Sequence, residues 1–97
     1  MNIGVCMIRL HLPENHSLKG KRQVLNSLIT RIKNKYNVAI AEVGDQDLWQ
    51  LATLGVACVS NSAQHADEVM AKVVEFVSHS RLDVELLDYE IEIIPFP

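Results

Sequence analysis

The chain has 97 residues, of which 48% are hydrophobic and 22% charged, and its formal net charge is −3. This length suits one small domain, and the composition is that of a folded protein rather than a disordered one. The longest uncharged run, residues 49–64, contains Gln, Thr, Ser and Asn, and the first residues lack the pattern of a signal peptide, so we expect no membrane span and a cytoplasmic location.

The charges are divided unevenly along the chain. Residues 1–35 hold seven Lys or Arg and one acid, a net of +6, whereas residues 36–97 hold two Lys or Arg and eleven acids, a net of −9. Such asymmetry predicts separate basic and acidic surfaces. The alternative is that the two halves neutralise each other across the folded domain.

The first half of the chain reads as a strand followed by a helix. Residues 2–12 are rich in Ile, Val, Met and Leu and end before Pro13, which predicts a strand. A short loop then leads to Ser17, a residue suited to the N-cap of a helix. Apolar residues recur with helical spacing over residues 18–34, and polar residues occupy the opposite side.

The second half reads as a hairpin, a helix and a last strand. Residues 36–43 and 49–60 are expected to form two strands joined by a turn at residues 44–47. Residues 63–78 carry an apolar stripe with helical spacing, and residues 83–94 alternate as a strand.

This order of elements predicts the ferredoxin-like α+β fold, βαββαβ, in a single domain spanning residues 1–97. Right-handed crossovers then give a four-stranded antiparallel sheet in the order 4-1-3-2, with both helices on one face. The other face of the sheet is left open. Because residues 2–12 are apolar on both sides at their beginning, we expect a homodimer through the open sheet face or an edge strand, unless the exposed apolar residues are simply tolerated.

Three cations, Lys19, Lys21 and Arg22, stand within four residues at the expected start of the first helix. Positive side chains are unfavourable there, because the helix dipole already places positive charge at this end. With Ser17 as N-cap, the free backbone N–H groups and these cations would form a site for phosphate, and Gly20 would let a ligand approach the backbone. The alternative is a solvated basic turn that pairs with acids of the second half. The candidate anion- or nucleic-acid-binding residues are Ser17, Lys19, Gly20, Lys21, Arg22, Arg31, Lys33 and Lys35.

Two further residues are candidates for a supporting role. Glu42 lies on a predicted strand and would be able to reach a cation such as Arg22 and hold it in place. Trp49 lies beside the predicted turn, where it would be able to stack on a base, although a lone Trp is more often part of a core or a dimer interface.

Other chemistries find little support. The four histidines form no close helical pair, and Asp45 and Asp47 occupy a turn that matches no calcium-binding loop, so no metal site is expected. No nucleophile elbow or glycine-rich phosphate loop is present, and we expect neither a cofactor nor catalysis. Cys6 and Cys58 lie in apolar runs and are expected to be reduced thiols.

Three short motifs carry a family resemblance: Ser-Leu-Lys-Gly-Lys-Arg at residues 17–22, Ala-Glu-Val at 41–43 and Trp-Gln at 49–50. With the long first strand, they resemble the YlxP-like family of small bacterial proteins over nearly the whole chain. The resemblance implies a ferredoxin-like fold, no established enzymatic activity and a role near RNA. Relatives often have an acid where this chain has Gly20, so the turn here is more cationic.

Two functions follow as hypotheses. The first is a non-enzymatic module that binds ribosomal RNA or a ribosomal particle through the basic residues of the first helix. The acidic net charge favours one structured partner over indiscriminate binding to nucleic acid. The second is a dimeric regulatory module that holds a phosphorylated metabolite at the same helix start.

Overall fold

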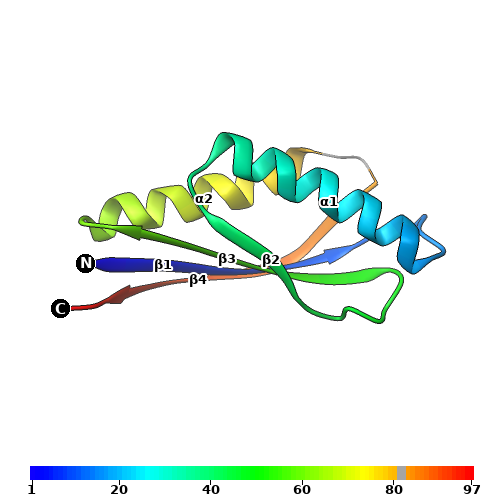
Figure 1. Ribbon diagram of the computed structural model, residues 1–97, viewed down its shortest axis with the longest axis horizontal. Coiled ribbons are helices and arrows are strands. Elements are labelled where there is room, and N and C mark those ends of the chain that lie inside the picture. The colour runs from blue at the N-terminus through cyan, green and yellow to red at the C-terminus, as the bar shows by residue number, and fades with distance from the viewer. Residues whose placement is uncertain (81–82) are drawn as a thin grey trace.

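The computed structural model describes residues 1–80 and 83–97. Its elements follow the predicted order (Figure 1). They are β1 (Asn2–His11), α1 (Leu18–Lys35), β2 (Ala39–Gly44), β3 (Leu51–Ser60), α2 (Ala63–Ser80) and β4 (Glu85–Pro95). Within these residues, neither helix combines the length and the apolar character that a membrane crossing requires.

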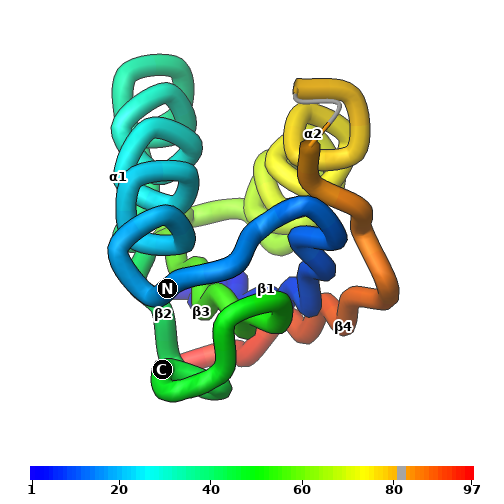
Figure 2. The backbone as a smooth tube through the Cα atoms, turned by 90° about the vertical axis from the view of Figure 1, so that its right-hand side faces the viewer, coloured from blue at the N-terminus to red at the C-terminus, as the bar shows by residue number. Residues whose placement is uncertain are grey.

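The four strands form one antiparallel sheet in the order β2-β3-β1-β4, which confirms the predicted ferredoxin-like α+β fold. Both helices lie on one face of this sheet. Figure 2 shows them above the strands, with the hairpin between β2 and β3 on the other side of the sheet. We call this other side the open face.

The central strand β1 has two different faces. Cys6, Ile8 and Leu10 point to the helices and are buried. They pack with Leu25, Leu28 and Ile32 of α1 and with Met70, Val73 and Val77 of α2. The alternate residues, such as Val5 and Met7, point to the open face. Burial on the helical side raises the pKa of the Cys6 thiol to about 11.

Three strands begin later than expected: β4 begins at Glu85 and not at residue 83, and β2 and β3 are each delayed for a local reason. Tyr36 caps α1, since its backbone N–H donates to Ile32 O at 2.8 Å, and its ring meets Phe76 of α2 edge to face. The strand β2 therefore begins at Ala39 and not at residue 36. At the hairpin, the turn extends through residue 50, so that Trp49 precedes β3 instead of belonging to it.

Candidate functional site

The first turn of α1 is capped as predicted. Ser17 has an extended backbone and its Oγ accepts a hydrogen bond from the N–H of Gly20 at 3.0 Å. The carbonyl of Ser17 accepts from the N–H of Lys21 at 3.1 Å. The cap therefore already uses one of the N–H groups on which the predicted anion site depended.

Gly20 makes room for a neighbour within the chain. A Cβ atom at this position would collide with Oδ1 of Asn15 and would lie 3.1 Å from Ser17 Oγ. The missing side chain is thus accounted for by the packing of Asn15 against the helix. The interpretation that Gly20 opens the backbone to a ligand is not needed.

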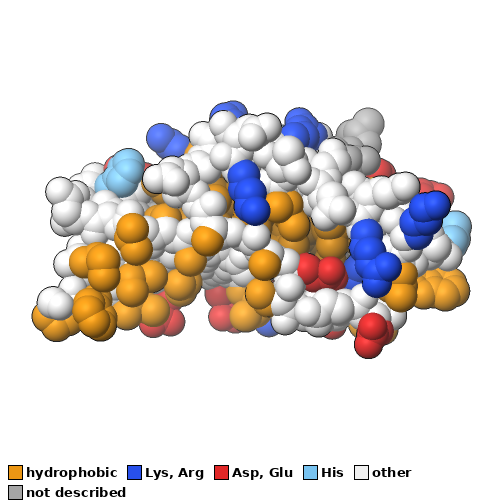
Figure 3. Space-filling view, in the orientation of Figure 1, with side chains coloured by type: hydrophobic (Ala, Val, Ile, Leu, Met, Phe, Trp, Pro, Cys, Tyr) orange, Lys and Arg blue, Asp and Glu red, His pale blue; other side chains and the backbone are white. Residues whose placement is uncertain are grey.

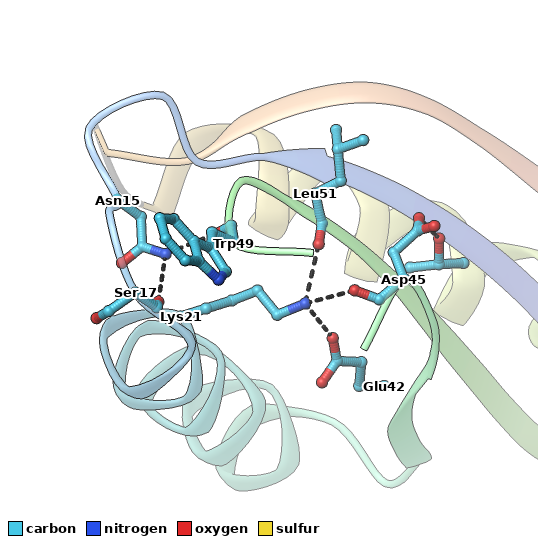
Figure 4. A network of polar contacts seen from close by, with 8 residues as sticks. Asn15, Ser17, Lys21, Glu42, Asp45, Trp49 and Leu51 are labelled. Atoms are coloured by element: carbon cyan, nitrogen blue, oxygen red, sulfur yellow. Dashed lines mark hydrogen bonds and ion pairs between the residues drawn. The ribbon is translucent and has the colours of Figure 1, made fainter. Parts of the chain in front are cut away.

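Lys21 does not belong to the exposed cationic surface, contrary to the expectation from sequence. It is only 1% exposed, and its aliphatic chain runs inward from α1 (Figure 4). Its Nζ lies 2.7 Å from Asp45 O, 3.0 Å from Leu51 O and 2.8 Å from Glu42 Oε2. Two of its donors are used by the two backbone carbonyls, and the ammonium charge is paired with the Glu42 carboxylate, so Lys21 is engaged within the molecule and not presented to a ligand.

Glu42 holds a cation as expected, but the cation is Lys21 and not Arg22. Its Oε2 atom is buried, while the side chain as a whole is 20% exposed. The 2.8 Å contact is an ion pair without the alignment of a good hydrogen bond, so the attraction is mainly Coulombic. Because the pair is largely removed from water, neither partner can be lost without leaving an unpaired charge inside.

Two amides complete the network that surrounds this ion pair. Asn15 Nδ2 donates to Ser17 O at 2.7 Å and to Trp49 O at 2.5 Å. Gln50 Nε2 donates to the carbonyls of Pro13 and Asn15 at 3.2 and 3.1 Å. We call Asn15, Lys21, Glu42 and Gln50 the polar clamp. It fastens the loop before α1 to the hairpin between β2 and β3.

The hairpin has its own internal support. Asp45 has a positive φ of 62°, the left-handed conformation that turns require and that Asp tolerates better than most residues. Its carboxylate accepts a hydrogen bond from Thr53 Oγ1 at 2.8 Å. With the polar clamp, this contact fixes the backbone on both sides of Leu48 and Trp49.

Trp49 is exposed although its backbone is held. Trp49 is 54% exposed, and Leu48 is 46% exposed. Both line a hollow of about 550 Å³ at the end of the sheet, together with His11 and Leu51. The bond from Asn15 to Trp49 O places this aromatic residue at the same end of the molecule as the start of α1 (Figure 4).

The remaining cations of α1 fall into two groups. Lys19, Arg22 and Lys33 are exposed and, at 3.6 residues per turn, lie within an arc of about 60° around the helix. We call these three residues the outer stripe. Figure 3 shows basic side chains along the upper surface, over α1. The helix carries no Asp or Glu, so no acid on α1 itself offsets this charge.

Arg31 and Lys35 point instead toward α2. The guanidinium of Arg31 lies 5.4 Å from the ring centre of Phe76 and donates to Ser80 O at 3.3 Å, while Lys35 Nζ lies 5.1 Å from the same ring. With Lys72 they line a groove of about 530 Å³ between the helices. Cation–π contacts give these two side chains a role in helix packing.

No set of three or more His, Cys, Asp or Glu side chains gathers in a metal-binding arrangement within residues 1–80 and 83–97. Apart from the Lys21–Glu42 ion pair, the hydrogen bonds described for the polar clamp are all donated to backbone carbonyls. The polar clamp is therefore suited to holding loops in place.

Comparison with known proteins agrees with the motifs. Residues 3–91 match the family described as "Protein of unknown function (DUF503)". The chain belongs to this family. It is 44% identical to "Uncharacterized protein YlxP" of Bacillus subtilis (strain 168) over 61 residues, which are 63% of this chain and 66%, just under two-thirds, of that relative. The resemblance to YlxP-like proteins is thus confirmed for this DUF503 chain.

The geometry gives the three motifs of this chain a physical meaning. Lys21 comes from the first motif, Glu42 from the second and Gln50 from the third, and all three belong to the polar clamp. Sequence reasoning gave Asn15 only the role of a turn residue and did not include it among the candidate site residues. The burial of Lys21 was also missed, although its position in the sequence indicates it. Lys21 lies four residues before Leu25 and therefore on the same buried side of the helix as Leu25, Leu28 and Ile32.

Proposed function

We propose that this protein is a non-enzymatic RNA-binding module of the cytoplasm, acting on ribosomal RNA or a ribosomal particle. The observation that carries the proposal is the outer stripe: three exposed cations on one side of an 18-residue helix without acids. Lys33 lies fourteen positions after Lys19, so the stripe extends about 21 Å along the helix. Several phosphates of a nucleic acid backbone fit within that length.

The polar clamp supports this function indirectly. By fixing the first turn of α1 against the hairpin, it holds Lys19 and Arg22 at the same end of the molecule as the exposed Trp49. Cations that contact phosphates beside an aromatic ring that stacks on a base are a common combination in proteins that bind single-stranded RNA. Net binding would depend on salt, because it rests on phosphate contacts.

The alternative of a phosphorylated metabolite at the start of α1 receives less support. Ser17 Oγ already accepts from the N–H of Gly20, and Lys21 is directed into the molecule. What remains there is Lys19 and Arg22 on an exposed surface, which suits a large partner better than a small ligand that needs enclosure.

The test is co-sedimentation with ribosomal particles and binding to ribosomal RNA fragments at several salt concentrations. The triple variant Lys19→Gln, Arg22→Gln and Lys33→Gln should bind at least about tenfold more weakly and reduce the salt slope by about 2 to 3, since each phosphate contact contributes 0.7 to 0.9. The matched control is Arg31→Gln, Lys35→Gln and Lys72→Gln, which removes the same charge from the groove between the helices. Equal losses in the two variants would show that only net charge matters and would contradict the proposal.

A further inference from the structure

The open face of the sheet contains an apolar hollow. Its volume is about 810 Å³, and it crosses all four strands. On the side of β2 and β3 the residues that point into it are small: Ala39, Ala41, Gly55 and Ala57. On the side of β1 and β4 they are larger: Val5, Met7, Glu90 and Glu92. One half of the face is thus depressed and the other half is raised.

This apolar surface continues beyond the hollow. Val43, Val59 and Ile94 are exposed at 53%, 69% and 38%. Figure 3 shows apolar side chains gathered along the lower left, at the end of the sheet where both termini lie. Monomeric proteins rarely leave a contiguous apolar surface of more than several hundred Å² in water, so a partner is expected to cover it.

The acidic side chains of the open face lie along one border, and the cation Arg9 lies beside them on β1. Glu90 and Glu92 are on the edge strand β4, as is Asp88, which pairs with Arg9 at 2.8 Å. This contact raises the pKa of Arg9 through a hydrogen bond and the carboxylate charge. The opposite border, β2, contributes Ala39, Ala41 and Val43, which carry no charge.

We propose that a second copy of this chain covers the open face, with the two sheets packed face to face about a two-fold axis that runs along the strands between β1 and β3. The proposal follows from the register of the sheet. Met7 is paired with Gly55, and Val5 with Ala57. Rotation about this axis exchanges the two strands, so Met7 of one copy stands over Gly55 of the other, and Val5 over Ala57.

The same rotation places β4 of one copy over β2 of the other. Within the sheet, Glu90 is paired with Met7, and Ala41 with Gly55. Glu90 of one copy therefore faces Ala41 of the other. By the same reasoning, Glu92 faces Ala39. The raised half of each face thereby meets the depressed half of its partner, except at Gly55, where Met7 would meet the Val43 side chain that lies over the glycine. An axis perpendicular to the strands would instead bring the two β4 strands together, acid against acid, which is unfavourable.

The face is large enough for such a dimer. The Cα atoms extend 45 Å along the longest axis, which follows the strands in Figure 1, and 22 and 19 Å in the other directions. The area of the open face, approximated by the longest times the shortest of these extents, is close to the area of about 800 Å² that each partner buries in a stable interface. Aligned packing of two sheets is a common arrangement in proteins.

Sedimentation equilibrium of the full chain at several concentrations tests the proposal, and we expect a dimer. Ala41→Glu would place a carboxylate opposite Glu90 of the second copy and should weaken the dimer at least tenfold. Ala41→Lys, the matched control, would pair with Glu90 and should keep the dimer. Ala41 is exposed in the single chain, so both variants should fold, which circular dichroism verifies. Gly55 is unsuitable for this test, because a Cβ there would lie 3.0 Å from Val43 Cγ1.

The symmetry is tested by a disulfide. The double variant Ala41→Cys and Glu90→Cys cannot close within one copy, since β2 and β4 are separated by two strands and lie about 14 Å apart. Mild oxidation should therefore link two copies. A wild-type monomer, a dimer unaffected by Ala41→Glu, dissociation by Ala41→Lys or a failure of the disulfide to form would each overturn the proposal. Binding of RNA by the separated copies would leave the proposed function intact.

Discussion

Replacing Lys21 by Met should destabilise the protein strongly, although the substitution removes a charge from a chain region that is rich in positive charge. Met keeps most of the aliphatic length of Lys, so the change mainly deletes the ammonium group. Three acceptors then lose their donor: the carbonyls of Asp45 and Leu51 and the carboxylate of Glu42.

The magnitude follows from the burial of the pair. Removing one member of a buried ion pair typically costs about 3–5 kcal/mol, because the other charge is left unpaired. The side chain of Glu42 is 20% exposed and can be partly hydrated, so the lower end applies, about 3 kcal/mol. In a domain of this size each kcal/mol lowers the melting temperature by about 4–8 °C, which predicts a decrease of about 12–24 °C.

The assay is urea unfolding followed by circular dichroism, with three variants compared. Lys19→Met, two residues away on the same helix but exposed, should change the free energy of unfolding by no more than about 0.5 kcal/mol. The double variant Lys21→Met and Glu42→Leu should be more stable than Lys21→Met alone, since it removes the unpaired carboxylate as well.

Two results would refute this reasoning. The first is a loss below about 1 kcal/mol for Lys21→Met, which would mean that water replaces the ammonium group without cost. The second is additivity of Lys21→Met and Glu42→Leu, because independent effects would show that the two side chains are not coupled.

Three further predictions concern Gly20, Cys6 and Trp49. Gly20→Ala should lower the melting temperature despite the better helix propensity of Ala, because the new Cβ meets Asn15. Asn15→Ala in the same chain should restore part of the loss. Equal melting temperatures for wild type and Gly20→Ala would contradict this prediction. Burial raises the pKa of the Cys6 thiol from 9.0 to about 11, so its contribution to the free energy of unfolding is fully present below pH 9. This contribution should fall by about 2 kcal/mol as the pH rises to 11. Cys6→Val should abolish this part of the pH dependence of unfolding. Trp49→Ala should change the free energy of unfolding by no more than about 0.5 kcal/mol but weaken RNA binding about fivefold or more. In the wild type, RNA binding should quench the fluorescence of this single Trp. An unquenched signal would exclude stacking on a base.

The order of elements and of strands was predictable because hydrophobic periodicity distinguishes the helices from the strands along most of this chain. The strand β1 alternates clearly only after Met7, yet its length and the Pro13 that follows were sufficient. The boundary at Tyr36 was missed because it depends on the ring of Phe76, forty residues further along the chain.

The candidate site was predicted less well, and the reason is the chemistry of Lys. A Lys side chain is long enough to lie along the surface or to reach inward to carbonyl oxygens, and sequence spacing alone does not decide between the two. For Lys21 the deciding acceptors are backbone atoms of Asp45 and Leu51, which any residue would supply. Lys19 and Arg22 are exposed, as expected, and make no comparable contact within residues 1–80 and 83–97.

Most acceptors of the polar clamp are backbone carbonyls, which every amino acid supplies. This affects which positions of related chains can be substituted. Substitutions at positions 48 and 51 leave the main-chain atoms in place, so these positions are free to change with whatever surface the hairpin must present. The side chains at positions 15, 21, 42 and 50 have no such freedom, and a change at 21 would need a compensating change at 42. The hairpin tip is therefore a place where recognition can diverge while the structure that supports it stays the same.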